Sequence, residues 1–135
     1  MIKIKTPKEI ETMQRGGKIL ADVLFETLTC VKPGVSELEL DKIAEGLIIK
    51  KGGQPGFKLV EGYKHTICIS VNDVVVHGVP TNYKIKEGDI VGIDCGVYYE
   101  GFHTDMAETI QVKSQNSKVK SLGVEKFLEI GKKAM

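Results

Sequence analysis

The stretch IVGIDCGVYYEGFHTDMAETI, residues 90–110, has the pattern of a β-hairpin. Apolar side chains alternate with Gly and Asp along its first half, and a polar, Gly-containing break precedes its second half. If the chain turns around Tyr99-Glu100, Asp94 lies directly opposite Asp105, with both side chains on one face and their Cβ atoms ~5 Å apart. A register slip or bulge would alter this pairing, so the register is itself a prediction.

The pairing of Asp94 with Asp105 has a physical cost. Two carboxylates that face each other repel, and burying an unpaired charge in a half-buried strand is unfavourable. A bound cation removes both penalties, and oxygen ligands suit Mn, Fe(II), Co, Zn or Mg. The sequence therefore predicts that the pair binds a divalent metal ion. The alternative is that both residues are exposed strand carboxylates paired with lysines.

Two helices are predicted before the hairpin, and each begins with a capping box. In the first, Thr6 caps the helix, Pro7 takes the first helical position and Glu9 bonds back to the cap. Ser36 and Glu39 open the second helix in the same way. Behind each cap, apolar residues recur at steps of three and four, which predicts one apolar face on each helix.

The other elements predict the fold class. Residues 66–71 and 74–76 are rich in β-branched side chains and are predicted as strands, and a last helix is expected from about residue 117 onward. Two helices, a strand-rich middle and a final helix indicate an α+β fold, in which helices cover one face of an antiparallel sheet. The length of 135 residues suits one domain.

Composition and charge exclude several classes of function. With 19 basic and 18 acidic residues the net charge is +1, and the chain lacks the basic stripe typical of nucleic-acid-binding proteins. Cys30, Cys68 and Cys95 form no CxxC pair, which favours reduced thiols in a cytosolic protein over disulfides or a thiolate zinc site. The chain shows neither a signal-peptide core nor an apolar run near the ~18 residues of a membrane span. We expect a soluble, cytoplasmic protein that acts on neither nucleic acid nor membrane.

The three histidines are weaker candidates than the aspartates. His77 precedes Gly-Val-Pro, a rigid turn that would aim its side chain, although a structural role suits a lone histidine equally well. His103 shares the face of Asp105 and either supports the metal ligands or is solvated. His65 is interpreted as a loop residue. Glu108 falls on the opposite face from Asp105, which argues against it as a ligand of the same ion.

Four segments of the chain, taken in order, form a recognisable pattern: IKTPKEIETM, VKPGVS, CISVNDVVVHGVP and GDIVGIDCGVYYEGFHTD. Together they resemble the N-terminal half of the type I methionine aminopeptidases, a family of pita-bread (creatinase-like) metallopeptidases of family M24. The combination of Asn-Asp-x-x-x-His-Gly-x-Pro with two spaced aspartates is more specific than either part alone. The resemblance runs from Ile4 to about Val112. It implies the N-terminal half of a pita-bread fold, with residues 1–135 as one incomplete domain.

The resemblance implies metal-dependent hydrolytic removal of the initiator methionine from nascent polypeptides. Asp94 and Asp105 would match the two family aspartates that hold a pair of divalent ions, such as Co, Mn, Fe(II) or Zn. Those ions would activate a bridging water and polarise the scissile carbonyl. His77 would match the histidine that contacts substrate near the scissile bond. Tyr63 and Cys68 align with positions that line the methionine side-chain pocket.

Members of that family are about twice as long and consist of two pseudo-symmetric halves that share one sheet. Their remaining metal ligands come from the half that has no counterpart here, so we expect this chain alone to lack normal turnover. An unpaired sheet edge would favour self-association. The competing hypothesis is a non-catalytic binding module, because some proteins with this fold have lost their metal ligands and work by protein association.

Overall fold

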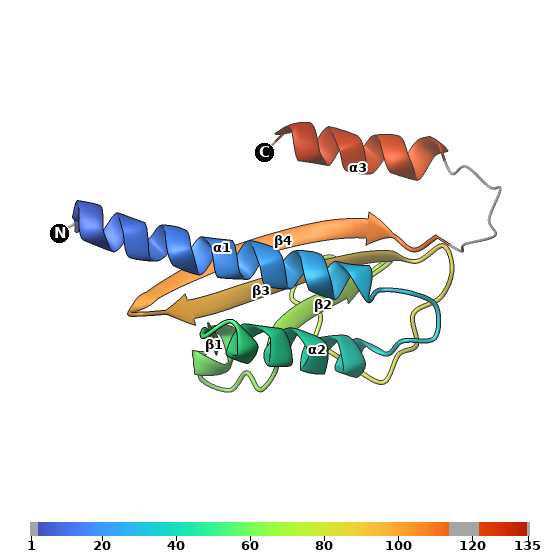
Figure 1. Ribbon diagram of the computed structural model, residues 1–135. Coiled ribbons are helices and arrows are strands. Elements are labelled where there is room, and N and C mark those ends of the chain that lie inside the picture. The colour runs from blue at the N-terminus through green and yellow to red at the C-terminus, as the bar shows by residue number, and fades with distance from the viewer. Residues whose placement is uncertain (1–2, 114–121, 135) are drawn as a thin grey trace.

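A computed structural model of the chain describes residues 3–113 and 122–134 as helices packed on an antiparallel sheet (Figure 1). The elements in chain order are α1 (Pro7–Thr29), α2 (Glu37–Lys50), β1 (Gln54–Pro55), the 3-10 helix η1 (Phe57–Leu59), β2 (Ile67–Val71), β3 (Ile90–Tyr99), β4 (Phe102–Gln111) and α3 (Leu122–Ala134). The predicted α+β class is confirmed. The expected start of the last helix, near residue 117, lies outside the described residues.

Both predicted capping boxes are present. The backbone N–H of Thr6 donates to the Glu9 carboxylate at 2.7 Å, and the N–H of Glu9 donates to the Thr6 hydroxyl at 3.3 Å. Ser36 and Glu39 make the same pair of bonds, at 2.7 and 3.2 Å. Each box satisfies two N–H groups that a helix start would otherwise leave unpaired. None of the helices in the described ranges is both long and apolar enough to cross a membrane.

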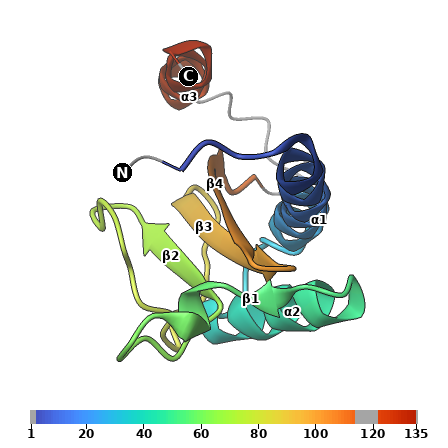
Figure 2. The same ribbon diagram turned by 90° about the vertical axis from the view of Figure 1, so that its left-hand side faces the viewer.

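The core lies between the sheet and the two N-terminal helices. α1 and α2 cover one side of the sheet, and α3 lies beyond β4 (Figure 2). β3 turns Val91, Ile93, Cys95 and Val97 toward the helices, each at most 1% exposed. Against them pack apolar side chains of α1 and α2: Leu20, Val23, Leu24, Leu40, Ala44 and Ile48. Because burying one such side chain is worth about 1.5–3 kcal/mol, this layer determines which residues of β3 face the other way.

β3 is the central strand of the sheet. β4 pairs along one of its edges, and β2 and the short β1 pair along the other, all antiparallel. β1 and η1 are not predicted from the sequence. β2, β3 and β4 are, and their ends lie within a residue or two of the predicted ones.

The turn between β3 and β4 lies one residue later than predicted. Glu100 and Gly101 have φ angles of 45° and 94°, and a two-residue hairpin turn of this kind needs positive φ at both central positions. Asp94 is consequently opposite Ala107, so the predicted direct pairing of Asp94 with Asp105 is wrong. The pairing slips by two residues. Side chains alternate with a period of two, so both aspartates stay on the same face.

Residues 74–76 form an irregular loop, and the predicted strand there is wrong. Instead of a strand, Gly78 lies against β2, where its carbonyl accepts a hydrogen bond of 2.8 Å from the N–H of Ile69. The three consecutive valines are exposed to 48%, 92% and 61%. The β-propensity of valine is thus overridden here, because propensity mainly reflects packing that this loop does not have.

Candidate metal centre

The face of the sheet turned away from α1 and α2 carries the predicted site. Asp94 lies on the central strand, with Cys68 of β2 opposite it on one side and Ala107 of β4 on the other. Asp105 is opposite Gly96, which is the next residue of β3 on this face. Asp94 and Asp105 are therefore diagonal neighbours across the β3–β4 ladder, a relation in which side chains remain within reach of each other.

The carboxylate of Asp94 is perturbed by its surroundings, Asp105 included. The pKa of Asp94 is raised to about 6, first because burial disfavours its charged form and then because Asp105 hydrogen-bonds to it and repels its charge. The electrostatic interaction with His77 lowers the same pKa. Within residues 3–113 and 122–134, neither aspartate forms an ion pair with Lys or Arg. The alternative of lysine-paired carboxylates therefore does not hold for this part of the chain.

Tyr63 and Cys68 form one side of the site. The Tyr63 hydroxyl donates to the carbonyl of Ile67 at 2.7 Å and lies 3.3 Å from the Sγ of Cys68. Burial raises the pKa of the Tyr63 hydroxyl and that of the Cys68 thiol, so both groups stay protonated at neutral pH. A protonated thiol is a weak nucleophile, and beside an aromatic ring it offers a soft, mostly apolar wall.

Phe57 adds an aromatic ring that the sequence analysis did not assign to the site. A Cβ atom at Gly96 would lie 2.6 Å from Cε1 of Phe57, so the ring covers Gly96 directly. Its centroid is 6.4 Å from that of Tyr63, in an edge-to-face arrangement. The available sequence signal was the glycine at position 96, because a glycine inside a strand often marks the close approach of another group.

His77 is held near the aspartates by the irregular loop. Its φ of 55° is uncommon for a non-glycine residue. The next residue, Gly78, fixes the loop to β2: its N–H donates to the Ser70 hydroxyl at 3.3 Å, and its carbonyl accepts from Ile69. A Cβ atom at Gly78 would lie 2.0 Å from the carbonyl oxygen of Ile69, so a larger residue does not fit. The structure thus brings the exposed His77 within electrostatic reach of Asp94.

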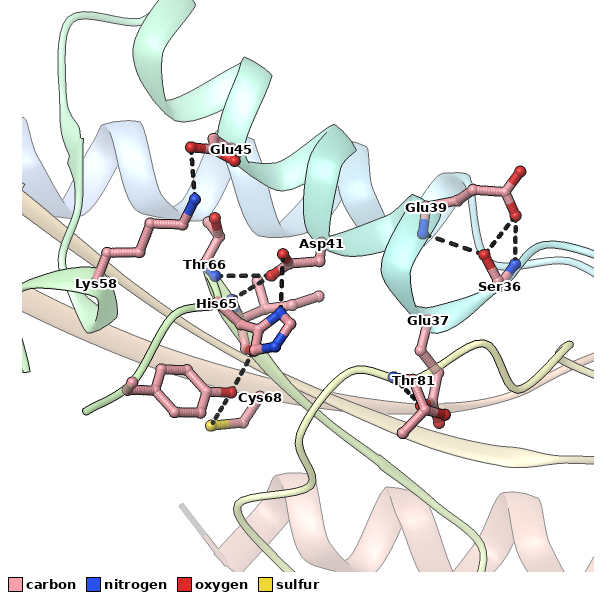
Figure 3. A network of polar contacts seen from close by, with 12 residues as sticks. Ser36, Glu37, Glu39, Asp41, Glu45, Lys58, His65, Thr66, Cys68 and Thr81 are labelled. Atoms are coloured by element: carbon pink, nitrogen blue, oxygen red, sulfur yellow. Dashed lines mark hydrogen bonds and ion pairs between the residues drawn. The ribbon is translucent and has the colours of Figure 1, made fainter.

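The other candidate groups make contacts of their own. His103 is exposed, and its ring packs on that of Tyr98 in the opposite strand, with the ring centroids 4.8 Å apart. Glu108 forms an ion pair of 2.8 Å with Lys132 of α3, consistent with the prediction that it faces away from Asp105. His65 is more than a loop residue, because its Nδ1 lies 3.3 Å from the Asp41 carboxylate, as Figure 3 shows.

The aspartate pair suits a divalent cation. Asp94 and Asp105 offer hard carboxylate oxygens on one face, and a cation would offset the burial and repulsion that raise the pKa of Asp94. Among the described residues, no group of three or more His, Cys, Asp or Glu is arranged to hold a metal ion. A cation at the pair would therefore take two ligands from it, and water or further donors would complete the coordination shell.

The chain matches a known metallopeptidase family. Residues 11–135 match the family model of metallopeptidase family M24. The chain is 45% identical over 122 residues to a methionine aminopeptidase of Clostridium perfringens, and the alignment covers 90% of this chain and 49% of that protein. The chain belongs to metallopeptidase family M24.

Solved structures agree with this assignment. Methionine aminopeptidase of Rickettsia prowazekii superposes with a TM-score of 0.90 at 30% identity, over 99% of this chain and 52% of that one. The Thermotoga maritima enzyme gives a TM-score of 0.88 at 36% identity, over 98% of this chain and 52% of that one. The predicted pita-bread (creatinase/aminopeptidase) fold is confirmed. The chain spans about half the length of the curated relatives it matches.

Proposed function

We propose that the chain supplies two aspartate ligands of a divalent-metal site that serves the hydrolytic removal of methionine from the N-termini of nascent polypeptides. One observation carries the proposal: Asp94 and Asp105 share the face of the sheet away from α1 and α2, the pKa of Asp94 is raised, and among the described residues neither carboxylate pairs with Lys or Arg. The names of the similar proteins supply the substrate. Free Cys30, Cys68 and Cys95 suit the reducing cytoplasm, where nascent chains are made.

Each residue has a separate role in this proposal. Asp94 and Asp105 would hold a pair of divalent ions (Co, Mn, Fe(II) or Zn), and such ions activate water and polarise a carbonyl. His77, exposed beside them, would hydrogen-bond the peptide near the scissile bond. Tyr63 and Cys68 would contact the methionine side chain, because a polarizable thioether packs well against an aromatic ring and a thiol.

We infer that the chain forms half of a catalytic domain and has little turnover alone. Two carboxylates leave most coordination positions to water, and a metal ion held this way binds weakly. Release of methionine from a Met-Ala-Ser peptide in the presence of Co or Mn measures this directly. Steady turnover by the 135-residue chain would overturn the inference while supporting the peptidase assignment.

Calorimetric titration with Mn²⁺ tests the metal site independently of turnover. Asp94→Asn removes one ligand and should abolish the binding heat. The matched control is Glu108→Gln, which removes an equal charge from the opposite face of the same hairpin and should leave the heat unchanged. If wild type gives no heat, or if Asp94→Asn titrates like wild type, the pair is not a metal site and the proposed function fails.

A non-catalytic, self-associating module is the second candidate, because several apolar side chains are exposed. Val75 is 92% exposed in the loop before His77, and Phe127 and Ile130 of α3 are 72% and 58% exposed. In addition, β4 pairs only with β3 within the described residues, which leaves its outer edge able to pair. Sedimentation over a range of concentrations distinguishes a dimer from a monomer. A dimer whose Mn²⁺ titration is flat would favour this second candidate.

A further inference from the structure

Three acidic residues of α2, spaced four apart, contact three different segments of the chain that follow the helix. Residues four apart lie on one side of a helix. Figure 3 shows Glu37, Asp41 and Glu45 directed toward these segments. Glu37 accepts from the N–H of Thr81 at 2.8 Å, and Glu45 pairs with Lys58 at 2.6 Å. Asp41, the middle one, holds the segment that leads into β2.

Asp41 is buried at 6% exposure and has three partners on that segment. Its Oδ1 accepts from the N–H groups of Thr66 and Ile67 at 2.7 and 3.1 Å, and its Oδ2 lies 3.3 Å from Nδ1 of His65. A buried carboxylate is tolerable when such charge-assisted hydrogen bonds replace water. These bonds fix where β2 begins, because they hold the first residue of the strand and the residue before it.

The contacts of Asp41 reach the Tyr63 and Cys68 side of the site by two routes. Through His65 they reach the Tyr63 ring, whose centroid is 5.8 Å from that of His65. Through Ile67 they reach the Tyr63 hydroxyl, which donates to the Ile67 carbonyl and lies 3.3 Å from the Sγ of Cys68. Asp41 is thus linked to the ring of Tyr63 through His65 and to its hydroxyl through Ile67.

The segment that carries Tyr63 depends on such support, because it buries little of its own surface. Leu59 and Val60 are 54% and 59% exposed, and between η1 and β2 the chain forms turns and bends without regular structure. A binding wall built on a loop keeps its shape only when neighbouring groups fix its side chains.

We propose that Asp41, acting with His65, is the positioning residue for the wall formed by Tyr63 and Cys68, and that it thereby sets the space available to an unbranched substrate side chain. The proposal rests on the proposed function for the identity of that side chain. Neither Asp41 nor His65 contacts substrate or metal in it. Helix α2, on the covered face of the sheet, would in this way determine the side-chain specificity of the open face.

Thiol labelling measures this positioning locally. In a Cys30→Ser background, the rates at which N-ethylmaleimide modifies Cys68 and Cys95 are followed by mass spectrometry of the peptides. Cys68, 8% exposed, is shielded by Tyr63, whereas Cys95, 1% exposed, lies in the core and reports opening of the whole fold. The ratio of the two rates therefore separates local loosening from general destabilisation.

Asp41→Asn should raise the Cys68 rate about tenfold and leave the Cys95 rate unchanged, because a neutral amide loses the charge-assisted bonds. The matched control is Glu45→Gln, an acid-to-amide change on the same helix whose partner is Lys58. This variant should leave both rates unchanged. If Asp41→Asn raises both rates together, or neither, Asp41 has only a general structural role and the proposal is overturned.

Fluorine NMR gives a second readout that does not depend on replacing a buried carboxylate. In chain labelled with 3-fluorotyrosine, the Tyr63 resonance is identified by its loss in Tyr63→Phe. His65→Gln, a change at a partly exposed side chain, should shift and broaden that resonance alone. An unchanged Tyr63 resonance would show that His65 does not position the Tyr63 ring, and would contradict that part of the proposal.

The Mn²⁺ titration separates failure of this proposal from failure of the proposed function. Asp41→Asn should bind Mn²⁺ as wild type does, because Asp94 and Asp105 are untouched. If the wild-type chain does not bind Mn²⁺, the metal-site proposal is contradicted, regardless of the Cys68 labelling rate. If Mn²⁺ binding is intact and Asp41→Asn leaves the ratio of the two labelling rates unchanged, only the positioning role is contradicted.

Discussion

Replacing Asp94 by asparagine is expected to stabilise the metal-free chain at neutral pH, although the same change removes a proposed metal ligand. The pKa of Asp94 is raised to about 6 from a reference value of 3.8. Between these values the folded chain binds more protons at this site than the unfolded chain does. The free energy of unfolding therefore falls as the pH rises from about 4 to about 6, and the full loss persists above that range.

The size of the effect follows from the shift. Two pKa units, at 1.36 kcal/mol each, correspond to about 3 kcal/mol. Asp94 is only partly buried, and water screens it, so we expect roughly 1 kcal/mol. For a chain of this length that is an increase of about 3–5 °C in melting temperature. Asparagine has nearly the same size as aspartate and can donate an N–H to Asp105, so the packing is preserved.

Calorimetric melting in EDTA is the assay, with wild type, Asp94→Asn and the charge control Glu108→Gln compared at about pH 7.5 and about pH 4.5. Asp94→Asn should melt above wild type at the higher pH, and the difference should shrink at the lower pH, where Asp94 is largely protonated. Glu108→Gln loses its ion pair with Lys132 and should not gain stability. Excess Mn²⁺ should reverse the order, because ligand binding stabilises only the chain that binds it.

One result would refute the reasoning. If Asp94→Asn melts at or below wild type in EDTA at about pH 7.5, the charge of Asp94 is already satisfied by protein groups. The raised pKa would then have no consequence for stability, and the argument that the pair needs a cation would lose its basis. A gain of the same size in Glu108→Gln would show that net charge, and not the pair, is responsible.

Three further substitutions, and Gly17→Ala as a control, test the backbone of the fold, each by urea unfolding. Gly78→Ala should lower the free energy of unfolding by more than ~2 kcal/mol, because its Cβ would overlap the carbonyl oxygen of Ile69. Gly17→Ala, which has open space around it, should raise the free energy of unfolding by up to ~1 kcal/mol. Glu100→Asn should gain ~0.5–1 kcal/mol, because asparagine tolerates the positive φ of this turn better. Ser36→Ala should lose ~1 kcal/mol with the capping box, and a loss below the error of the measurement would contradict the role of that cap.

Features governed by neighbours in the sequence could be predicted. The capping boxes of Thr6 and Ser36 depend on residues three apart, and both formed as expected. The alternation along β3 correctly placed Asp94 on the face away from the helices, because a strand has a period of two. The register was missed by two residues, since the glycine at position 101 fixes the turn and the prediction centred the turn one residue too early.

Features that depend on distant contacts could not be predicted. The bonds from Asp41 to Thr66 and Ile67 join residues 25 and 26 positions apart, and no periodic pattern relates them. Three consecutive valines indicated a strand at 74–76, but the bonds that Gly78 makes to β2 gave that backbone another position. Both unpredicted features, the Asp41 bonds and the irregular loop at 74–76, lie in segments that border the candidate site, where tertiary contacts override local propensity.

The diagonal register of the two aspartates bears on the proposal that they hold metal ions together. Side chains directly opposite each other on two strands have Cβ atoms about 4.5–5.5 Å apart, whereas diagonal neighbours are about 7–8 Å apart. Carboxylates in direct opposition would crowd into the same space. In the proposed site, diagonal positions would let Asp94 and Asp105 each turn a carboxylate oxygen toward a shared ion without this crowding. The alternation of side chains along the strands determines which face the two aspartates share, and the position of the turn makes them diagonal neighbours. If the pairing slipped by two further residues, the two carboxylates would be separated, but the core residues would stay buried.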